Sequence, residues 1–273
     1  MIRVALGLVV FLFGLCVGSF LNVVVYRLNH NLSPLKGRSF CPKCKKKIPW
    51  RDNIPLLSFA LLRGKCRFCH SPISWQYPLV ELSTGILTVL VVFHLTGVGV
   101  AASPLLRWLD GLLEGIIFHL LITYTLIVLF VSDLRYQTIP DEAVYPAMAL
   151  VFAFHLRGGL TQWFRLGSVL MTAFGASLFF LVLVLATRGK GMGMGDVKLA
   201  GLMGLVLGYP KIIIALILAF LTGALVGVIL VLVGKKRFEG QIPFGPFLTS
   251  ATWLSLFWGQ TIWQFYVEKL LLS

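Results

Sequence analysis

Residues 211–234 read KIIIALILAFLTGALVGVILVLVG, and the lysine at the start is the only charged residue of this stretch. An α-helix needs about 20 predominantly apolar residues to cross a bilayer. Comparable apolar runs occupy residues 4–25, 79–100, 114–132, 167–187 and 246–267, and shorter runs occupy 143–156 and 197–209. The sequence therefore predicts an all-α polytopic membrane protein with about eight transmembrane helices. The two short runs suit tilted, interfacial or re-entrant helices.

The composition excludes a single large soluble core. Hydrophobic residues make up 58% of the chain and charged residues 12%, whereas a soluble domain is about half apolar and a quarter charged. The short alternating strands of a membrane β-barrel are not apparent in the sequence. No small-residue cleavage site follows the first apolar run, so we expect that run to remain as an uncleaved span.

The charge distribution predicts the orientation in the membrane. The net charge is +14, and segment 26–77 holds 11 Lys and Arg residues but only one acidic residue. Because positive loops remain on the cytoplasmic side, the N-terminus is expected outside and 26–77 inside. The loops 133–142, 188–196 and 235–245 then also fall inside. The basic loop would also attract anionic membrane lipids, whereas no nucleic-acid-binding module accompanies it.

Four cysteines in segment 26–77 predict a metal site. Cys41 and Cys44 form one CxxC pair, Cys66 and Cys69 form another, and 21 residues separate the pairs. This spacing is typical of a four-cysteine zinc ribbon with a closed, structural metal site. His70 is a less favoured ligand, and disulfides or redox thiols are the alternatives. We expect three parts, which are a first helix (1–25), a cytoplasmic zinc-binding loop (26–77) and a transmembrane catalytic helical domain (78–273).

Two aspartates lie at the edges of apolar runs, although the chain has only 10 acidic residues. Acidic residues at a membrane boundary are a functional-site hypothesis by default. Asp133 falls at the expected C-terminal end of a helix, where the macrodipole disfavours a negative charge, and an ion pair with Arg135 is its structural alternative. Asp196 follows glycines that permit close approach to a substrate, with helix capping as the alternative. Asp141 is better explained as a helix N-cap.

A pair of carboxylates can act as complementary acid and base. One removes a proton from water while the other protonates or polarises the substrate carbonyl, and this chemistry needs no metal. The charge distribution places Asp133 and Asp196 at the same membrane face. Contact between them does not follow from the sequence, because they lie 63 positions apart.

Several longer motifs resemble those of one family, the bacterial type IV prepilin peptidases, which are membrane aspartic proteases of the GxGD type. The motifs are the two CxxC pairs together with GSFLNVVVYRL (18–28), YPLVELSTG (77–85), DLRYQTIPD (133–141), GMGMGDVKLAG (191–201) and IPFGPFL (242–248). The resemblance implies an enzyme that removes the basic leader of prepilins or pseudopilins at the cytoplasmic face. It also implies methylation of the new N-terminus with S-adenosylmethionine in many members.

The resemblance assigns residue roles as well. Asp133 and Asp196 match the catalytic aspartates, and Glu81 and Gly85 match the ExxxG pattern associated with methyl transfer. Their structural alternatives are a helix-start carboxylate and close helix packing. IPFGPFL predicts either a broken helix at the active site or a turn before a helix. We expect Glu239 or anionic lipid to receive the basic leader.

Other classes of function remain open from the sequence. A peptidase without methyl transfer would have the same fold. An ion- or proton-coupled transporter would use the aspartates as ion sites, although such residues usually lie nearer the middle of a span. A zinc-ribbon assembly scaffold would have no chemistry at either aspartate.

Overall fold

The computed structural model describes residues 2–34, 36–96, 105–156, 160–189, 192–233 and 243–267. Within these ranges the chain is helical, with no strand beyond two isolated bridges. A short 3-10 helix (Trp50–Asn53) and α2 (Leu57–Leu61) lie between two long helices. The eight longer helices are α1 (Ile2–Leu28), α3 (Gln76–Thr96), α4 (Leu105–Tyr136), α5 (Asp141–Leu156), α6 (Leu160–Ala186), α7 (Met194–Leu207), α8 (Lys211–Leu232) and α9 (Gly245–Tyr266). The predicted all-α class is confirmed.

Five helices in the described ranges are long and apolar enough to cross a membrane, namely Val4–Leu28, Gln76–Thr96, Leu113–Tyr136, Leu166–Ala186 and Lys211–Leu232. The helices α5 and α7 have 16 and 14 residues, so both are as short as the sequence predicts. The helix α9 has 22 residues but is not among the five, because Thr, Ser, Gln and Gly residues interrupt its apolar sequence.

The start of α4 differs from the prediction. The apolar run predicted a helix from residue 114, whereas α4 begins at Leu105. The N-terminal limit of the apolar run is set by the charged residues Arg107, Asp110 and Glu114. Charged residues can lie within a helix, so the helix itself begins earlier. The predicted end of the preceding helix, at residue 100, lies outside the described residues.

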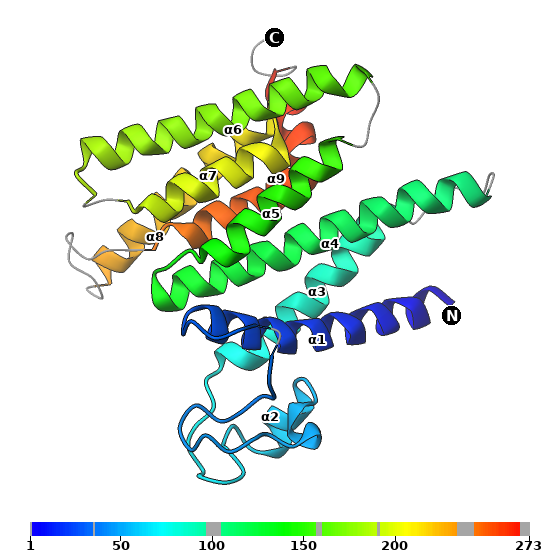
Figure 1. The fold of residues 1–273 in the computed structure, drawn as a ribbon, viewed down its shortest axis with the longest axis vertical. Helices are drawn as coiled ribbons and strands as arrows, with labels where there is room; N and C mark the ends of the chain where they lie inside the picture. The colour runs from blue at the N-terminus through cyan, green and yellow to red at the C-terminus, as the bar shows by residue number, and fades with distance from the viewer. Residues whose placement is uncertain are drawn as a thin grey trace. The chain divides into compact units, whose positions relative to one another are not determined.

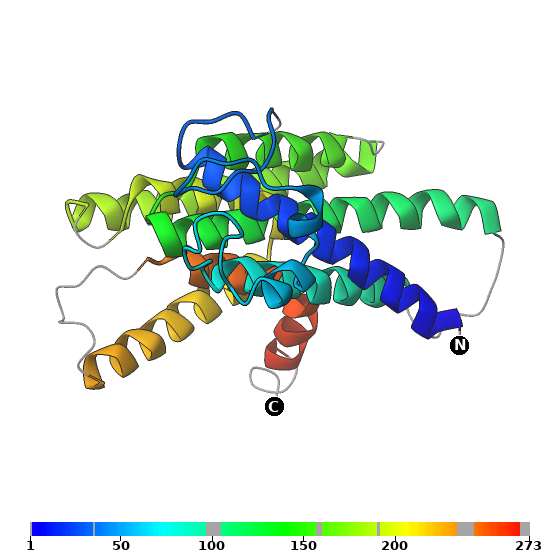
Figure 2. The same ribbon diagram turned by 90° about the horizontal axis from the view of Figure 1, so that it is seen from below.

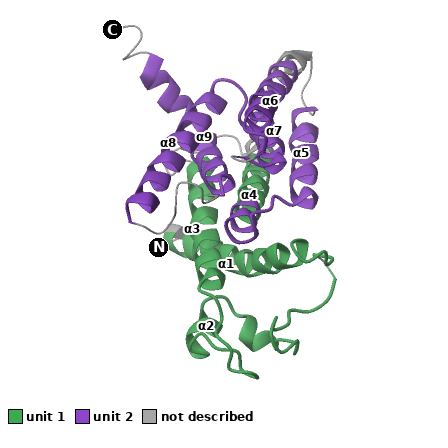
Figure 3. Cartoon of the chain, turned by 90° about the vertical axis from the view of Figure 1, so that its left-hand side faces the viewer, with its two compact units in different colours: residues 1–128 green, residues 129–273 purple. Residues whose placement is uncertain are grey.

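The chain forms two compact units, residues 1–128 and 129–273 (Figure 3). In the first unit, α1 packs along α3 through small residues. A Cβ atom added to Gly18 would lie 2.8 Å from the Cα of Glu81, and one added to Gly85 would lie 2.8 Å from the Phe11 ring. Such contacts let two helix backbones approach closely. The packing units thus divide the chain at a different place from the three functional parts expected from the sequence.

The segment between α1 and α3 is mostly irregular, with the short α2 as its clearest helix (Figures 1 and 2). Cys41 is the only buried residue among those described between positions 36 and 77. This segment therefore has almost no apolar core of its own. We call residues 39–75 the cysteine module.

The second unit is built around α7. This helix packs against α5, α6 and α9, and α8 packs against α9 (Figure 1). Leu199, Leu202 and Met203 of α7 are fully buried or nearly so. A Cβ atom added to Gly204 would lie 2.4 Å from the Cα of Ala173 in α6, so the two helices meet backbone to backbone. Asp196, in the first turn of α7, is buried, whereas Met194 of the same turn is exposed.

Candidate functional site

Asp133 lies one turn before the end of α4 and has 7% of its surface exposed. Its Oδ2 atom accepts a hydrogen bond of 2.9 Å from the backbone N–H of Gly245. The guanidinium of Arg135, the ion-pair partner considered from the sequence, lies over the ring of Tyr136. The structure thus gives this carboxylate a backbone donor from a segment 112 residues away.

Asp196 is the third residue of α7 and is equally buried, with 8% exposed. Its Oδ2 atom accepts a 3.2 Å hydrogen bond from the N–H of Gly193, the N-cap residue. The capping alternative is therefore met in part, because this carboxylate satisfies one N–H at the helix start. The side chain still has a second oxygen for other chemistry.

The two carboxylates are close enough to influence one another. Burial raises the pKa of Asp196 to about 6, and the negative charge of Asp133 acts in the same direction. Such a pair holds its last proton at a much higher pH than an isolated aspartate does. The structure therefore brings together, within the second unit, the two aspartates that the sequence singled out.

Gly245 was not singled out by the sequence. It is the first residue of α9, so the IPFGPFL segment is a turn that precedes a helix, as one of the two interpretations had it. Its N–H, however, points at Asp133. The only signal in the sequence was the Pro and Gly interruption of an apolar run, because a backbone donor has no residue type of its own.

Asp141 and the glycine-rich stretch support the start of α7. Asp141 is the first residue of α5, one position after the N-cap that the capping interpretation gave it, and its two oxygens accept 2.6 and 2.9 Å hydrogen bonds from Nζ of Lys198. A Cβ atom added to Gly195 would lie 3.1 Å from the side chain of Ile139. The turn after α4 is thereby joined to α7 by an ion pair and by close packing.

The four cysteines form one cluster in the first unit. The Sγ atoms of Cys41, Cys44, Cys66 and Cys69 all lie within 4.8 Å of one another. Four thiols at this separation fit the tetrahedral coordination of zinc, so these side chains are the ones that would hold the ion. His70 is not part of the cluster found among the described residues, in line with its lower rank as a ligand.

The two CxxC pairs lie in equivalent turns that repeat with an offset of 25 residues. Lys45 N–H donates to the carbonyl of Cys41, and His70 N–H donates to the carbonyl of Cys66. Both Lys45 and His70 have a positive φ, at 59° and 52°. The repeat is visible in the sequence as FCPKCKKKIPW (40–50) and KCRFCHSPISW (65–75). The prediction of the metal site rested on the cysteine spacing and did not include this longer repeat.

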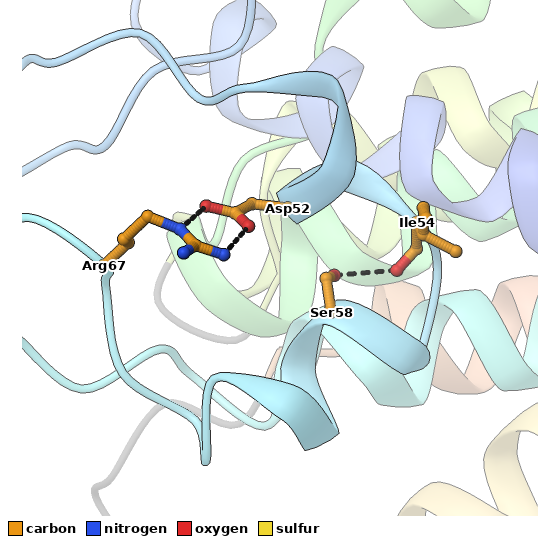
Figure 4. A network of polar contacts seen from close by, with 4 residues as sticks. All are labelled: Asp52, Ile54, Ser58 and Arg67. Carbon is orange, nitrogen blue, oxygen red and sulfur yellow. Dashed lines mark hydrogen bonds and ion pairs between the residues drawn. The ribbon is translucent and has the colours of Figure 1, made fainter.

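Local contacts also act on one of the thiols and on the module around it. A hydrogen bond with the Ser71 hydroxyl lowers the pKa of Cys69 to about 6, which favours the thiolate that binds metal. Asp52 accepts two hydrogen bonds, of 2.6 and 2.7 Å, from the guanidinium of Arg67 (Figure 4). This pair links the 3-10 helix to the second cysteine turn.

Glu81 connects α3 to the cysteine module. Its Oε2 atom accepts a 2.8 Å hydrogen bond from the N–H of Leu56, which has a positive φ of 58°. It also accepts a hydrogen bond from the side chain of Ser19 in α1. Asn22 of α1 donates to the carbonyl of Tyr77, one turn before Glu81, and so joins α1 to α3. The ExxxG motif that begins at Glu81 thus lies where α1, α3 and the module meet.

Comparison with known proteins identifies the family of the chain. Residues 12–95 match the bacterial peptidase A24 N-terminal domain, and residues 120–228 match the type IV leader peptidase family. The chain is 36% identical to a prepilin leader peptidase/N-methyltransferase of Aeromonas hydrophila, over 96% of this chain and 94% of that protein. The chain belongs to the type IV leader peptidase family. The family resemblance predicted from the motifs is therefore confirmed.

Further members of the leader peptidase family are similarly related. A prepilin leader peptidase/N-methyltransferase of Legionella pneumophila is 32% identical over 95% of this chain and 94% of that protein. One from Bacillus subtilis is 32% identical over 96% of this chain and 98% of that protein. No solved structure matches the chain. The matched range 120–228 contains both aspartates, whereas Gly245 lies beyond it.

Proposed function

We propose that this protein removes the leader of type IV prepilins or pseudopilins with Asp133 and Asp196 as its catalytic pair. The observation that carries the proposal is the electrostatic proximity of two buried carboxylates, each held by the N–H of a glycine. The substrate class follows from the names of the relatives, which are prepilin leader peptidases. A buried pair near the ends of apolar helices can meet a substrate whose own apolar helix is in the membrane.

In the proposed reaction the pair begins with one proton, held by Asp196. Asp133 takes a proton from water, the water oxygen bonds to the scissile carbonyl carbon, and Asp196 gives its proton to the carbonyl oxygen. The tetrahedral intermediate then collapses, and the carbon–nitrogen bond breaks. Asp133 passes its proton to the leaving amine, and Asp196 recovers a proton from one hydroxyl group of the intermediate, which becomes the new carboxylic acid. The pair ends in its starting state.

The raised pKa of Asp196 gives a pH dependence. Because the proposed acid must be protonated, kcat for cleavage should decline as the pH rises through about 6, the pKa to which burial raises Asp196. An aspartate with an ordinary pKa of about 3.9 would place the decline roughly two pH units lower. Peptide cleavage measured in detergent from pH 4 to pH 9 tests this. A profile that falls with a midpoint near 4 would contradict the assignment of Asp196 as the acid.

The charge distribution supports an orientation with the site at the cytoplasmic face. Eighteen of the 24 basic residues fall in the segments placed inside, with Lys198 counted among them. The leader is basic too, so segment 26–77 is unsuited to attract it. Carboxylates or anionic lipids are better receivers of the leader. Glu239, which lies outside the described residues, remains our candidate for this role.

We propose that the same protein methylates the new N-terminus, with Glu81 in the region that performs the transfer. S-adenosylmethionine, implied by the N-methyltransferase name of the relatives, would supply the methyl group. The Glu81 carboxylate is chemically suited to accept from an ammonium or a hydroxyl group. Gly85, one turn further on, lies against Phe11 and Leu15, which supports a role through the packing of α1 on α3.

Replacing Glu81 with Gln separates the two activities. The amide keeps the size and one oxygen for Leu56 N–H but loses the negative charge, so methyl transfer should fall by about 100-fold if the carboxylate binds an ammonium. Cleavage should change by less than about threefold, because the aspartates belong to the other unit. Mass spectrometry of the pilin N-terminus, with and without S-adenosylmethionine, reports the cleavage position and the added methyl group together.

Each outcome of that experiment bears on the proposals. Wild-type protein should give a cleaved product that gains the mass of a methyl group only when S-adenosylmethionine is present. A cleaved product that is never methylated would show that the protein is a peptidase without methyltransferase activity. Unaltered methylation by the Glu81→Gln variant would show that the Glu81 carboxylate has no role in methyl transfer.

A further inference from the structure

The segment Pro243–Pro246 presents a backbone donor to a proposed catalytic carboxylate. Gly245 begins α9, so its N–H is one of the first four in the helix, which have no carbonyl partner inside it. The partner is instead Oδ2 of Asp133, at 2.9 Å. The positive end of a helix dipole adds to the attraction for a negative charge at this place.

Space, rather than backbone conformation, requires glycine at this position. A Cβ atom added to Gly245 would lie 2.6 Å from Oδ2 and 2.9 Å from Cγ of Asp133. Gly245 is not among the glycines that have a positive φ. Any side chain at residue 245 would therefore displace the carboxylate from its present position.

A cluster of aromatic rings holds the preceding residue. The ring centroid of Phe244 lies 5.2 Å from that of Phe220 in α8, 6.1 Å from that of Phe247 and 6.3 Å from that of Phe180 in α6. Phe180 is fully buried. A Cβ atom added to Gly223 of α8 would lie 3.0 Å from the Phe244 ring. Three helices of the second unit thus fix the residue next to Gly245.

We propose that Gly245 is a positioning residue of the peptidase, whose N–H fixes Oδ2 of Asp133 and so directs Oδ1 toward the attacking water. A hydrogen bond donated to a carboxylate stabilises its ionised form, which is the form needed in the member of the pair that acts as base. Asp196 has the longer of the two bonds, 3.2 Å from Gly193. This inference rests on the proposed catalytic role of Asp133.

The Gly245→Ala variant tests the geometry. The added methyl group should displace the Asp133 carboxylate, and a displacement of about 1 Å can lower the rate about 100-fold. We expect that loss in kcat for leader cleavage, with KM within about twofold of the wild-type value, because Gly245 acts on the reacting groups and not on the substrate. Gly175→Ala in α6 is the matched control, since a Cβ atom there meets nothing within 4 Å.

A second substitution removes the hydrogen bond without adding atoms. Incorporating glycolic acid at position 245 by nonsense suppression replaces the amide N–H with an ester oxygen. The acidic limb of the kcat profile should then move to higher pH by about one unit, because the ionised base has lost a donor. A purely structural role of residue 245 would lower thermal stability and leave this limb unmoved.

The outcomes separate this inference from the proposed function. Unchanged kcat in Gly245→Ala, or an unmoved acidic limb in the ester variant, would overturn the positioning role while leaving the aspartate pair intact. Full cleavage by an Asp133→Asn variant would instead overturn the catalytic pair itself. Thermal unfolding of each purified variant in detergent shows whether it remains folded.

Discussion

Asparagine in place of either Asp133 or Asp196 is expected to lower kcat for leader cleavage by about 10³- to 10⁴-fold, because positioned acid–base groups contribute up to that factor. An amide neither gives nor takes the proton that the mechanism requires. The carboxamide keeps one oxygen, which can accept the N–H of Gly245 or of Gly193 as the carboxylate does. Cleavage of a synthetic prepilin by purified variants in detergent measures the loss.

The double variant sharpens this prediction. If the two aspartates act as one unit, Asp133→Asn combined with Asp196→Asn should lose little more activity than either single change, because such effects are far from additive. Asp52→Asn is the matched control, since Asp52 pairs with Arg67 in the cysteine module and has no proposed part in cleavage. Near-normal cleavage by either single variant would contradict the proposal that Asp133 and Asp196 form the catalytic pair.

The same variants discriminate between classes of function. A transporter would lose ion flux and a scaffold would lose nothing measurable in a cleavage assay. Both aspartates lie near helix ends, Asp133 one turn before the end of α4 and Asp196 in the first turn of α7. This placement suits contact with a leader at the membrane surface better than an ion path through the middle of a span.

The sequence was sufficient for the aspartate pair because acidic residues at the ends of apolar runs are rare. Asp133 and Asp196 each had a structural alternative, and Asp196 also fulfils its own by accepting the N–H of Gly193. Their proximity could not be predicted, because it depends on how α7 packs among α5, α6 and α9. Helix packing of this kind is set by side-chain shape over many contacts, which no single motif expresses.

The backbone donors to the carboxylates could not be predicted from the sequence for a different reason. Gly245 and Leu56 donate their N–H groups to Asp133 and Glu81, and neither residue type indicates a donor to a carboxylate. Leu56 adopts a positive φ that is unusual for leucine, which no propensity would have predicted. The sequence could thus name both carboxylates but not the backbone groups that hold them.

Removal of zinc is expected to unfold the cysteine module. Among the residues described between positions 36 and 77 only Cys41 is buried, so apolar burial cannot hold the module together. Structural zinc binding contributes roughly 10–16 kcal/mol in small peptides, which exceeds the stability of most domains. Metal analysis should find one zinc ion per chain, and chelation should abolish hydrogen-exchange protection of the Lys45 and His70 amides, which lie in the two cysteine turns.

Cysteine variants and reductant distinguish zinc from the alternatives. Cys44→Ser should lose the metal and the protection together, whereas Cys16→Ser should lose neither, because Cys16 lies in α1 away from the cluster. Disulfides would make the protection sensitive to reductant instead of chelator. Unchanged protection after complete removal of zinc would contradict a structural role for the metal.

The loss of zinc should also affect the hydrogen bond that Glu81 accepts from Leu56. Leu56 lies between the two cysteine pairs, and its N–H is donated to the Glu81 carboxylate from a backbone conformation that is strained for leucine. Only the folded module can hold Leu56 in that conformation, so unfolding it removes the donor from Glu81. We therefore expect chelation to lower methyl transfer in proportion to the lost protection, and re-addition of zinc to restore both. A chelated protein that methylates at the wild-type rate would show that Glu81 works without the module.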